Sequence, residues 1–145
     1  MDLVEKLDHV AFAVRDKKRA ALYLTNVLGA REVFDMEWGG FRFTSFLMGS
    51  GSMLELIYAD EPGSFVNRFI EKRGEGVHHL TFKVRDIEEM IEHLRSRGLS
   101  PFDINTSNDL WKDCYIHPRE GMGTLIQFAE FDEEEWARIW EESKK

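Results

Sequence analysis

Two histidines occupy equivalent places in two similar segments of the chain. His9 in the first half and His79 in the second are each followed, in the same order and at the same spacing, by Phe, Val, Arg and Asp. A second pair of segments, Met-Leu-Glu-Leu and Leu-Ile-Gln-Phe, places Glu55 and Gln127 at equivalent points, with nearly the same offset between the halves. An internal repeat of this kind indicates two similar modules, each of which carries two polar residues at matching positions.

These four residues have side chains that can bind a metal ion. Imidazole nitrogen and carboxylate oxygen together suit Zn, Ni, Co, Mn or Fe as divalent ions, while the amide oxygen of Gln127 is a weaker, neutral ligand. Glu55 lies within an apolar strand, where a buried carboxylate requires a partner. If each module curls its strands, both pairs point into one concave face. The sequence therefore predicts metal ligands at His9, Glu55, His79 and Gln127, with open positions left for water or substrate.

The remaining histidines lack this support. His78 precedes His79 in a strand, so alternation directs it to the opposite face, where we expect a structural role. His93 and His117 have no counterpart in the other half of the chain.

Each half follows the order strand, helix and three strands, as judged from apolar periodicity, capping residues and turn-forming residues. The first half is expected to contain a strand at 7–14, a helix at 17–28, and strands at 30–36, 41–48 and 52–58. For the second half we expect a first strand from about residue 77, a helix between Asp86 and Gly98, and strands near 100–105, 112–117 and 123–128.

The predicted fold class is α+β: two tandem βαβββ modules with pseudo-twofold symmetry form a curled mixed sheet around a metal site. We expect residues 1–145 to form a single domain. Its parts are module one at about 7–60, a connecting helix at about 62–74, module two at about 77–130 and a C-terminal helix at about 132–143. Trp136 and Trp140 on that last helix are expected to pack against the body of the protein or a second subunit.

Bulk properties narrow the possible functions. The chain has 145 residues, of which 43% are hydrophobic and 32% charged, as is typical of a soluble globular protein. Its net charge of −8 argues against nucleic acid as a partner. No apolar run approaches the roughly 18–20 residues of a membrane helix, and the N-terminus does not resemble a signal peptide. Cys114 is the single cysteine, which fits a reducing cytoplasm. We predict a cytoplasmic protein, without a membrane partner, that acts on a small molecule.

The paired modules with a histidine in each first strand resemble the vicinal oxygen chelate superfamily, which includes glyoxalases, bleomycin resistance proteins and extradiol dioxygenases. The resemblance covers about residues 7–130. Within the superfamily, Phe69–Leu80, Ile116–Arg119 and Gly123–Gln127 are most similar to methylmalonyl-CoA epimerases. The resemblance implies a divalent metal held by the four residues named above. Because many proteins of this fold pair their modules across subunits, it also makes a homodimer plausible.

The chain departs from the epimerase pattern in two places. Epimerases of this group typically have Gln in the last strand of module one and Glu in module two, whereas this chain has Glu55 and Gln127. Their additional catalytic carboxylate lies on a middle strand of module one, and the matching Phe41–Thr44 contains no acid. Glu55 is therefore predicted to be both ligand and catalytic base, with nearby Glu37 as a second catalytic candidate.

The leading hypothesis is a metal-dependent isomerase or epimerase that stabilises an enolate of an acyl-CoA or a similar thioester. A lyase resembling glyoxalase I, acting on a thiol adduct, is an alternative because it can use one metal-bound carboxylate. His9, His79 and Glu55 could also form the two-histidine, one-carboxylate iron site of a dioxygenase. A drug-binding resistance protein without enzymatic activity is the alternative outside enzymes.

Overall fold

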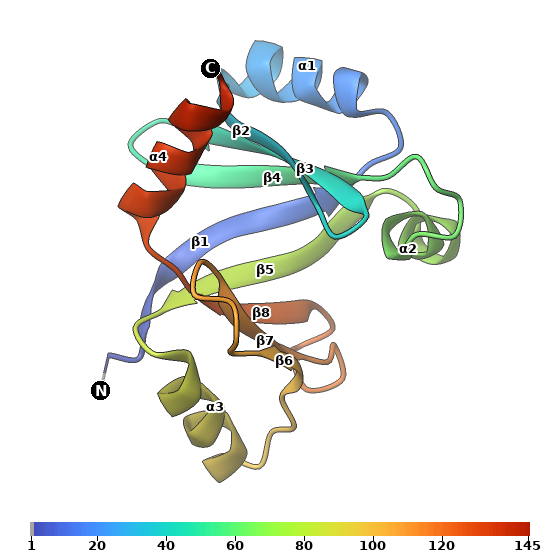
Figure 1. Cartoon of the computed structure of the whole chain (residues 1–145). Coiled ribbons are helices and arrows are strands. Elements are labelled where there is room, and N and C mark those ends of the chain that lie inside the picture. Colours follow the sequence, from blue (N-terminus) through green and yellow to red (C-terminus); the bar gives the residue numbers. More distant parts are fainter. Residues whose placement is uncertain (1) are drawn as a thin grey trace. The chain divides into compact units, whose positions relative to one another are not determined.

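The structure, a computed structural model, describes residues 2–145 and contains eight strands and four helices in that range (Figure 1). The helices are α1 (Lys17–Leu28), α2 (Phe65–Arg73), α3 (Ile87–Ser96) and α4 (Glu133–Ser143). The strands are β1 (Val4–Ala13), β2 (Arg31–Trp38), β3 (Phe41–Met48), β4 (Ser52–Tyr58), β5 (Gly76–Val84), β6 (Phe102–Asn105), β7 (Lys112–Ile116) and β8 (Leu125–Glu130). The predicted α+β class is confirmed, and α1, β3 and β4 have the bounds expected from the sequence.

The chain divides into two compact units. Asp8–His79 form the first unit, and the described residues up to Leu7 together with Leu80–Lys145 form the second. Strands β1 and β5 each pass from one unit into the other. The pseudo-twofold relation of the modules and the single domain stay predictions.

The first unit contains a mixed sheet in the order β2-β3-β4-β1, in which β1 and β4 are parallel and the other pairs antiparallel. Glu55 on β4 lies opposite Ala11 on β1 and Ser45 on β3. Because side chains alternate along a strand, His9 shares the face of Ala11. The register therefore places His9, Ser45 and Glu55 on one face of this sheet.

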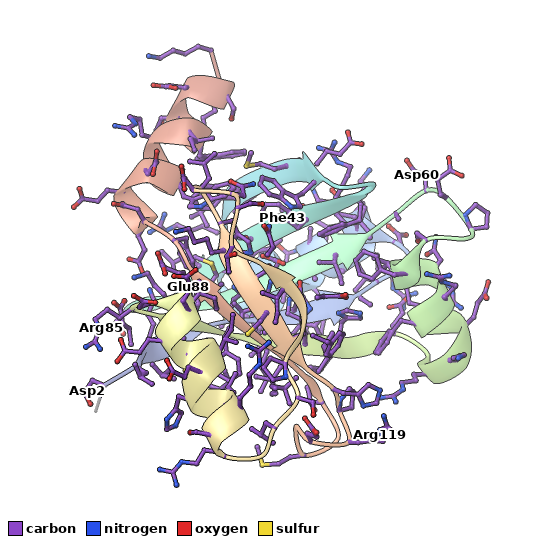
Figure 2. The ribbon with its side chains drawn as sticks, turned by 60° about the horizontal axis from the view of Figure 1, so that its bottom comes forward. Asp2, Phe43, Asp60, Arg85, Glu88 and Arg119 are labelled. Carbon is purple, nitrogen blue, oxygen red and sulfur yellow. The ribbon has the colours of Figure 1, made fainter. Side chains whose placement is uncertain are left out.

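The two helices of the first unit pack against opposite faces of its sheet. Leu24 of α1 packs with Phe46 and Leu56, which alternate away from Glu55. Ile57 and Ile70, in contrast, belong to a cluster in which α2 packs on the face that carries Glu55. Phe43 on β3, labelled in Figure 2, joins this second cluster. Helix α2 therefore covers part of the face where the predicted ligands lie.

Capping residues explain where α1 and α2 begin and where α1 ends. The Asp16 carboxylate accepts a hydrogen bond from the backbone N–H of Arg19, and the Ser64 hydroxyl accepts one from Asn67. Gly29 ends α1 in the left-handed conformation, with φ at 68°, which glycine adopts without steric cost.

In the second unit the strand order is β5-β8-β7-β6, and α3 packs on β7 and β8. Cys114 is fully buried in that core. On α4, the Trp136 indole N–H donates to the Leu110 carbonyl and its ring meets Trp111 edge-on. The expectation that Trp136 packs against the body of the protein is thus confirmed. None of the described helices has the length and apolar character needed to cross a membrane.

Candidate metal centre

Three of the four predicted metal ligands meet in the first unit. His9 on β1, Glu55 on β4 and His79 on β5 each offer a ligand atom, and these atoms lie within 4.8 Å of one another. The side chains are 5%, 9% and 8% exposed, respectively. His9 Nε2 is 3.5 Å from Glu55 Oε2, and the two imidazole rings meet edge-on with centroids 5.8 Å apart. Two nitrogens and a carboxylate in a buried site fit a divalent transition metal.

A serine that the sequence did not single out supports the carboxylate. The Ser45 hydroxyl donates to Glu55 Oε2 at 3.4 Å, from the position directly across the β3–β4 ladder. This contact fixes one carboxylate oxygen, which also faces His9. The contact of Ser45 with Glu55 becomes evident only from the pairing of β3 with β4, because the sequence of β3 is not part of the internal repeat.

Burial and neighbouring charges shift the pKa values of the cluster in different directions. Burial raises the pKa of the Glu55 carboxyl, although the His9 charge opposes the shift. Burial would lower the pKa of His9, but the Glu55 carboxylate and the hydrogen bond to Asp8 outweigh it, so the pKa is raised. For His79, burial lowers the pKa well below its usual value, and the charges of His9 and His78 add to this. Without metal, the raised pKa values favour a proton on the His9–Glu55 pair, whereas the lowered pKa of His79 favours its neutral form.

The residue that precedes each histidine contacts that histidine. Asp8 Oδ2 lies 2.8 Å from His9 Nδ1, and His78 Nδ1 lies 2.8 Å from His79 Nδ1. Burial lowers the pKa of His78 to about 4, so this ring is neutral near pH 7. The expectation that His78 lies away from the site with a structural role missed this contact. The signal was the repeat itself, which places a polar residue directly before both histidines.

Gln127, the fourth predicted ligand, lies on β8 in the second unit and is 5% exposed. Its amide oxygen accepts a hydrogen bond from the Thr81 hydroxyl at 2.6 Å. Its amide nitrogen donates to Asp113 Oδ2 at 2.8 Å and to the Tyr115 hydroxyl at 3.0 Å. This network fixes which way the amide points. The role of Gln127 as a ligand stays a prediction.

Glu37, the second catalytic candidate, lies on the other face of the first unit's sheet. It is paired in register with Arg42 and forms a 3.8 Å ion pair with it, while 69% of its side chain is exposed. Arg42 alternates with Phe43 and so points away from the face of Ser45 and Glu55. The structure does not bring Glu37 to the metal-ligand cluster, and its catalytic role stays a prediction.

Known proteins are similar to this chain over most of its length. Residues 8–115 match the Glyoxalase/Bleomycin resistance protein/Dioxygenase superfamily. The ethylmalonyl-CoA/methylmalonyl-CoA epimerase of Cereibacter sphaeroides is 26% identical over 88% of this chain and 99% of its own. The mitochondrial methylmalonyl-CoA epimerase of Homo sapiens is 25% identical over 86% of this chain and 73% of its own.

A solved structure has the same fold. The methylmalonyl-CoA epimerase of Mycobacterium tuberculosis superposes with a TM-score of 0.81 and 28% identity, covering 93% of each chain. The predicted resemblance to this superfamily, and within it to methylmalonyl-CoA epimerases, is confirmed. Because these relatives are enzymes, the prediction of an enzyme is confirmed as well.

Proposed function

The chain belongs to the Glyoxalase/Bleomycin resistance protein/Dioxygenase superfamily, and from this premise we propose that it is a metal-dependent epimerase or isomerase of an acyl-CoA thioester. The observation that carries the proposal is the buried cluster of His9, Glu55 and His79. Epimerisation next to a carbonyl removes an α proton and generates an enolate, whose charge must be stabilised. The similarity to epimerases supports the reaction class, and the substrate class follows from what those relatives are named for.

In this proposal the cluster residues have distinct roles. His9, Glu55 and His79 would hold the metal, and Gln127 is the fourth ligand predicted from the sequence. The bound divalent cation supplies positive charge that stabilises the enolate as it develops. Glu55 is also the group that accepts the α proton. It is the one carboxylate in the described cluster, and Ser45 holds the Oε2 atom that faces His9.

Return of the proton to the opposite face of the substrate requires a second group. Glu37 is the residue proposed from the sequence, although it is exposed and paired with Arg42. Glu37→Gln tests this role directly. If Glu37 acts in the second step, the variant keeps exchange of the α proton with solvent but loses inversion of the substrate.

Deuterium exchange tests the proposed reaction. The chain is loaded with Co(II) or Mn(II) and incubated with methylmalonyl-CoA in D₂O, and incorporation at the α carbon is followed by mass spectrometry. Loss of a general base typically costs 10²- to 10⁴-fold, so we expect Glu55→Gln to slow exchange by about that factor. Glu61→Gln, an exposed loop carboxylate of the same unit, is the matched control and should exchange at the parent rate. If the parent chain exchanges the α proton no faster than Glu55→Gln does, the proposed epimerase activity is wrong.

One observation favours the glyoxalase-like lyase as a second candidate. The described cluster contains a single carboxylate, and a lyase of this kind can move its proton with one such group. Methylglyoxal with a thiol is the discriminating substrate. A lyase converts that adduct and leaves methylmalonyl-CoA unexchanged, whereas the proposed epimerase does the reverse.

A further inference from the structure

The Nδ1 atom of each histidine in the cluster contacts the side chain of the preceding residue, and the two preceding residues differ in chemical type. Asp8 offers a carboxylate oxygen to His9 Nδ1, and His78 offers a ring nitrogen to His79 Nδ1, both at 2.8 Å. Asp8 and His78 occupy the same place in the two halves of the repeat. Neither is itself part of the cluster of ligand atoms.

These contacts determine which ring nitrogen of each histidine carries a proton. A carboxylate accepts hydrogen bonds, so the Asp8 contact requires N–H at His9 Nδ1, and in the neutral ring Nε2, which faces Glu55, keeps its lone pair. The two Nδ1 atoms of His78 and His79 lie within hydrogen-bond distance and share one proton. If His79 donates it, His79 Nε2 can bind a metal; if His78 donates it, His79 Nε2 is protonated and cannot.

The surroundings of His78 hold its ring in place. Its centroid lies 5.5 Å from that of Phe65 and 4.8 Å from that of Phe69, both on α2. His78 Nδ1 therefore remains beside His79, and the ring is anchored by a helix that also packs on the Glu55 face of the sheet. In this place the ring can accept a hydrogen bond from the Nδ1–H of His79.

We propose that Asp8 and His78 are positioning residues, which fix His9 and His79 as Nδ1–H tautomers so that both Nε2 atoms bind the metal. The inference rests on the proposed metal-dependent function. The two supports are unequal: the anionic Asp8 makes His9 the stronger electron donor, and the neutral His78 orients His79 without adding charge.

The first test needs no metal. Two-bond ¹⁵N–¹H spectra of the metal-free chain report the tautomer of each imidazole, assigned with single His→Asn variants. We expect Nδ1–H for His79 and Nε2–H for its partner His78. We also expect His78→Phe, which keeps a ring against α2 but removes the acceptor, to shift His79 away from the Nδ1–H form. His79 found as the Nε2–H tautomer in the parent chain would overturn the proposal.

The second test measures Co(II) affinity by calorimetry and Co(II) geometry by visible absorption. Loss of an outer-shell partner typically costs 10–100-fold in metal affinity, and we expect His78→Phe and Asp8→Ala to lose about that much. His78→Asn restores an acceptor near the Nδ1 position and should recover most of the affinity and the parent spectrum. His93→Phe on α3, outside the cluster, is the control and should bind as the parent does.

The outcomes separate this inference from the proposed function. Equal loss in His78→Phe and His78→Asn would mean that His78 acts through packing, and the positioning role would be wrong while the metal site stands. Full affinity in His78→Phe would likewise show that the positioning role is wrong. If the parent chain binds no Co(II), both the proposed function and the positioning role are wrong. If it binds Co(II) but does not exchange the α proton of methylmalonyl-CoA, only the proposed epimerase activity is wrong.

Discussion

At the scale of single residues, the first unit brings together a carboxylate and two histidines whose protonation differs. His9 has a raised pKa beside Glu55, and His79 has a lowered one because it is buried next to other imidazoles. A metal ion that binds both must therefore compete with protons more strongly at the first than at the second. The cluster is therefore sensitive to pH mainly through His9 and Glu55.

Metal affinity should fall as the pH is lowered. Because the Glu55 carboxylate and the hydrogen bond to Asp8 raise the pKa of His9 despite its burial, protons compete with the metal for this ligand more strongly as the pH falls, and metal binding releases protons. Co(II) titrations in buffers of different ionisation enthalpy measure both the affinity and the protons released. Affinity that is constant from pH 6 to 8, with no proton release, would contradict the assigned ligand.

The metal-free chain should lose stability in acid through His78. Its pKa of about 4 lies below the unfolded value of 6.5, so between these values the unfolded chain binds more protons. Stability is fully present above pH 6.5 and is lost as the pH falls to 4, by on the order of 2–3 kcal/mol for this group. Urea unfolding at pH 7 and pH 4.5 should show a smaller acid loss in His78→Phe than in the parent, with His93→Phe as the control. An identical loss in all three chains would contradict the assignment.

At the scale of elements, α2 connects the core of the first unit to the cluster. Ile70 is 2% exposed and packs on the sheet, while Phe65 and Phe69 of the same helix contact His78. A change in how α2 packs should therefore alter the position of the His78 ring, which contacts His79.

Truncating the buried side of α2 tests that connection. Ile70→Ala should lower the free energy of unfolding by about 2–5 kcal/mol, as large-to-small core changes do. Arg68→Ala, exposed on the same helix, should change it little. Urea unfolding gives the free energies, and the ¹⁵N spectrum of His78 reports the local effect. A loss in Arg68→Ala equal to that in Ile70→Ala would show that the packing described is not what stabilises α2.

The turn between β7 and β8, where Figure 2 labels Arg119, has no room for a side chain at Gly121. A Cβ there would lie 2.5 Å from the Thr124 carbonyl oxygen, so the backbone must shift. We expect Gly121→Ala to destabilise the chain by about 1–3 kcal/mol. Gly63→Ala, where the Cβ meets nothing within 4 Å, is the matched control. Thermal unfolding with equal midpoints for the two variants would contradict this.

Most elements could be predicted from the sequence because caps and periodicity are local. Asp16 and Gly29 bracket α1, and its bounds agree with the structure. Strand β1 begins at Val4 instead of Leu7, because its first residues are exposed on both sides and show no alternation. Strand β8 begins at Leu125 instead of Gly123, since that glycine has a φ of 85° and belongs to the turn.

At the scale of the whole molecule, the repeat singled out three residues that lie together but did not reveal the side chains that contact them. The meeting of His9, Glu55 and His79 follows from equivalent places in similar segments. Ser45 and His78 could not be found in the same way, because their roles depend on strand register and on side-chain orientation. Long-range pairing, unlike capping, leaves no local signal.

The predicted homodimer and cytoplasmic location stay predictions. A subunit of 17.0 kDa should sediment with twice that mass if the homodimer forms. Trp140 lies on α4, which has no buried residue, and it is the predicted contact. Trp140→Ala should therefore shift the mass towards the monomer. A parent chain that sediments with the mass of a single subunit at micromolar concentration would exclude the dimer.

The central claim is that His9, Glu55 and His79 form a metal centre. Crystals of the parent chain grown with Co(II) and measured above and below the cobalt edge test it most directly. We expect one anomalous peak within about 2.0–2.2 Å of both histidine Nε2 atoms and a Glu55 oxygen, with the peak lost in His79→Ala. Crystals with no cobalt peak at these three side chains, or with one that persists in His79→Ala, would contradict the account.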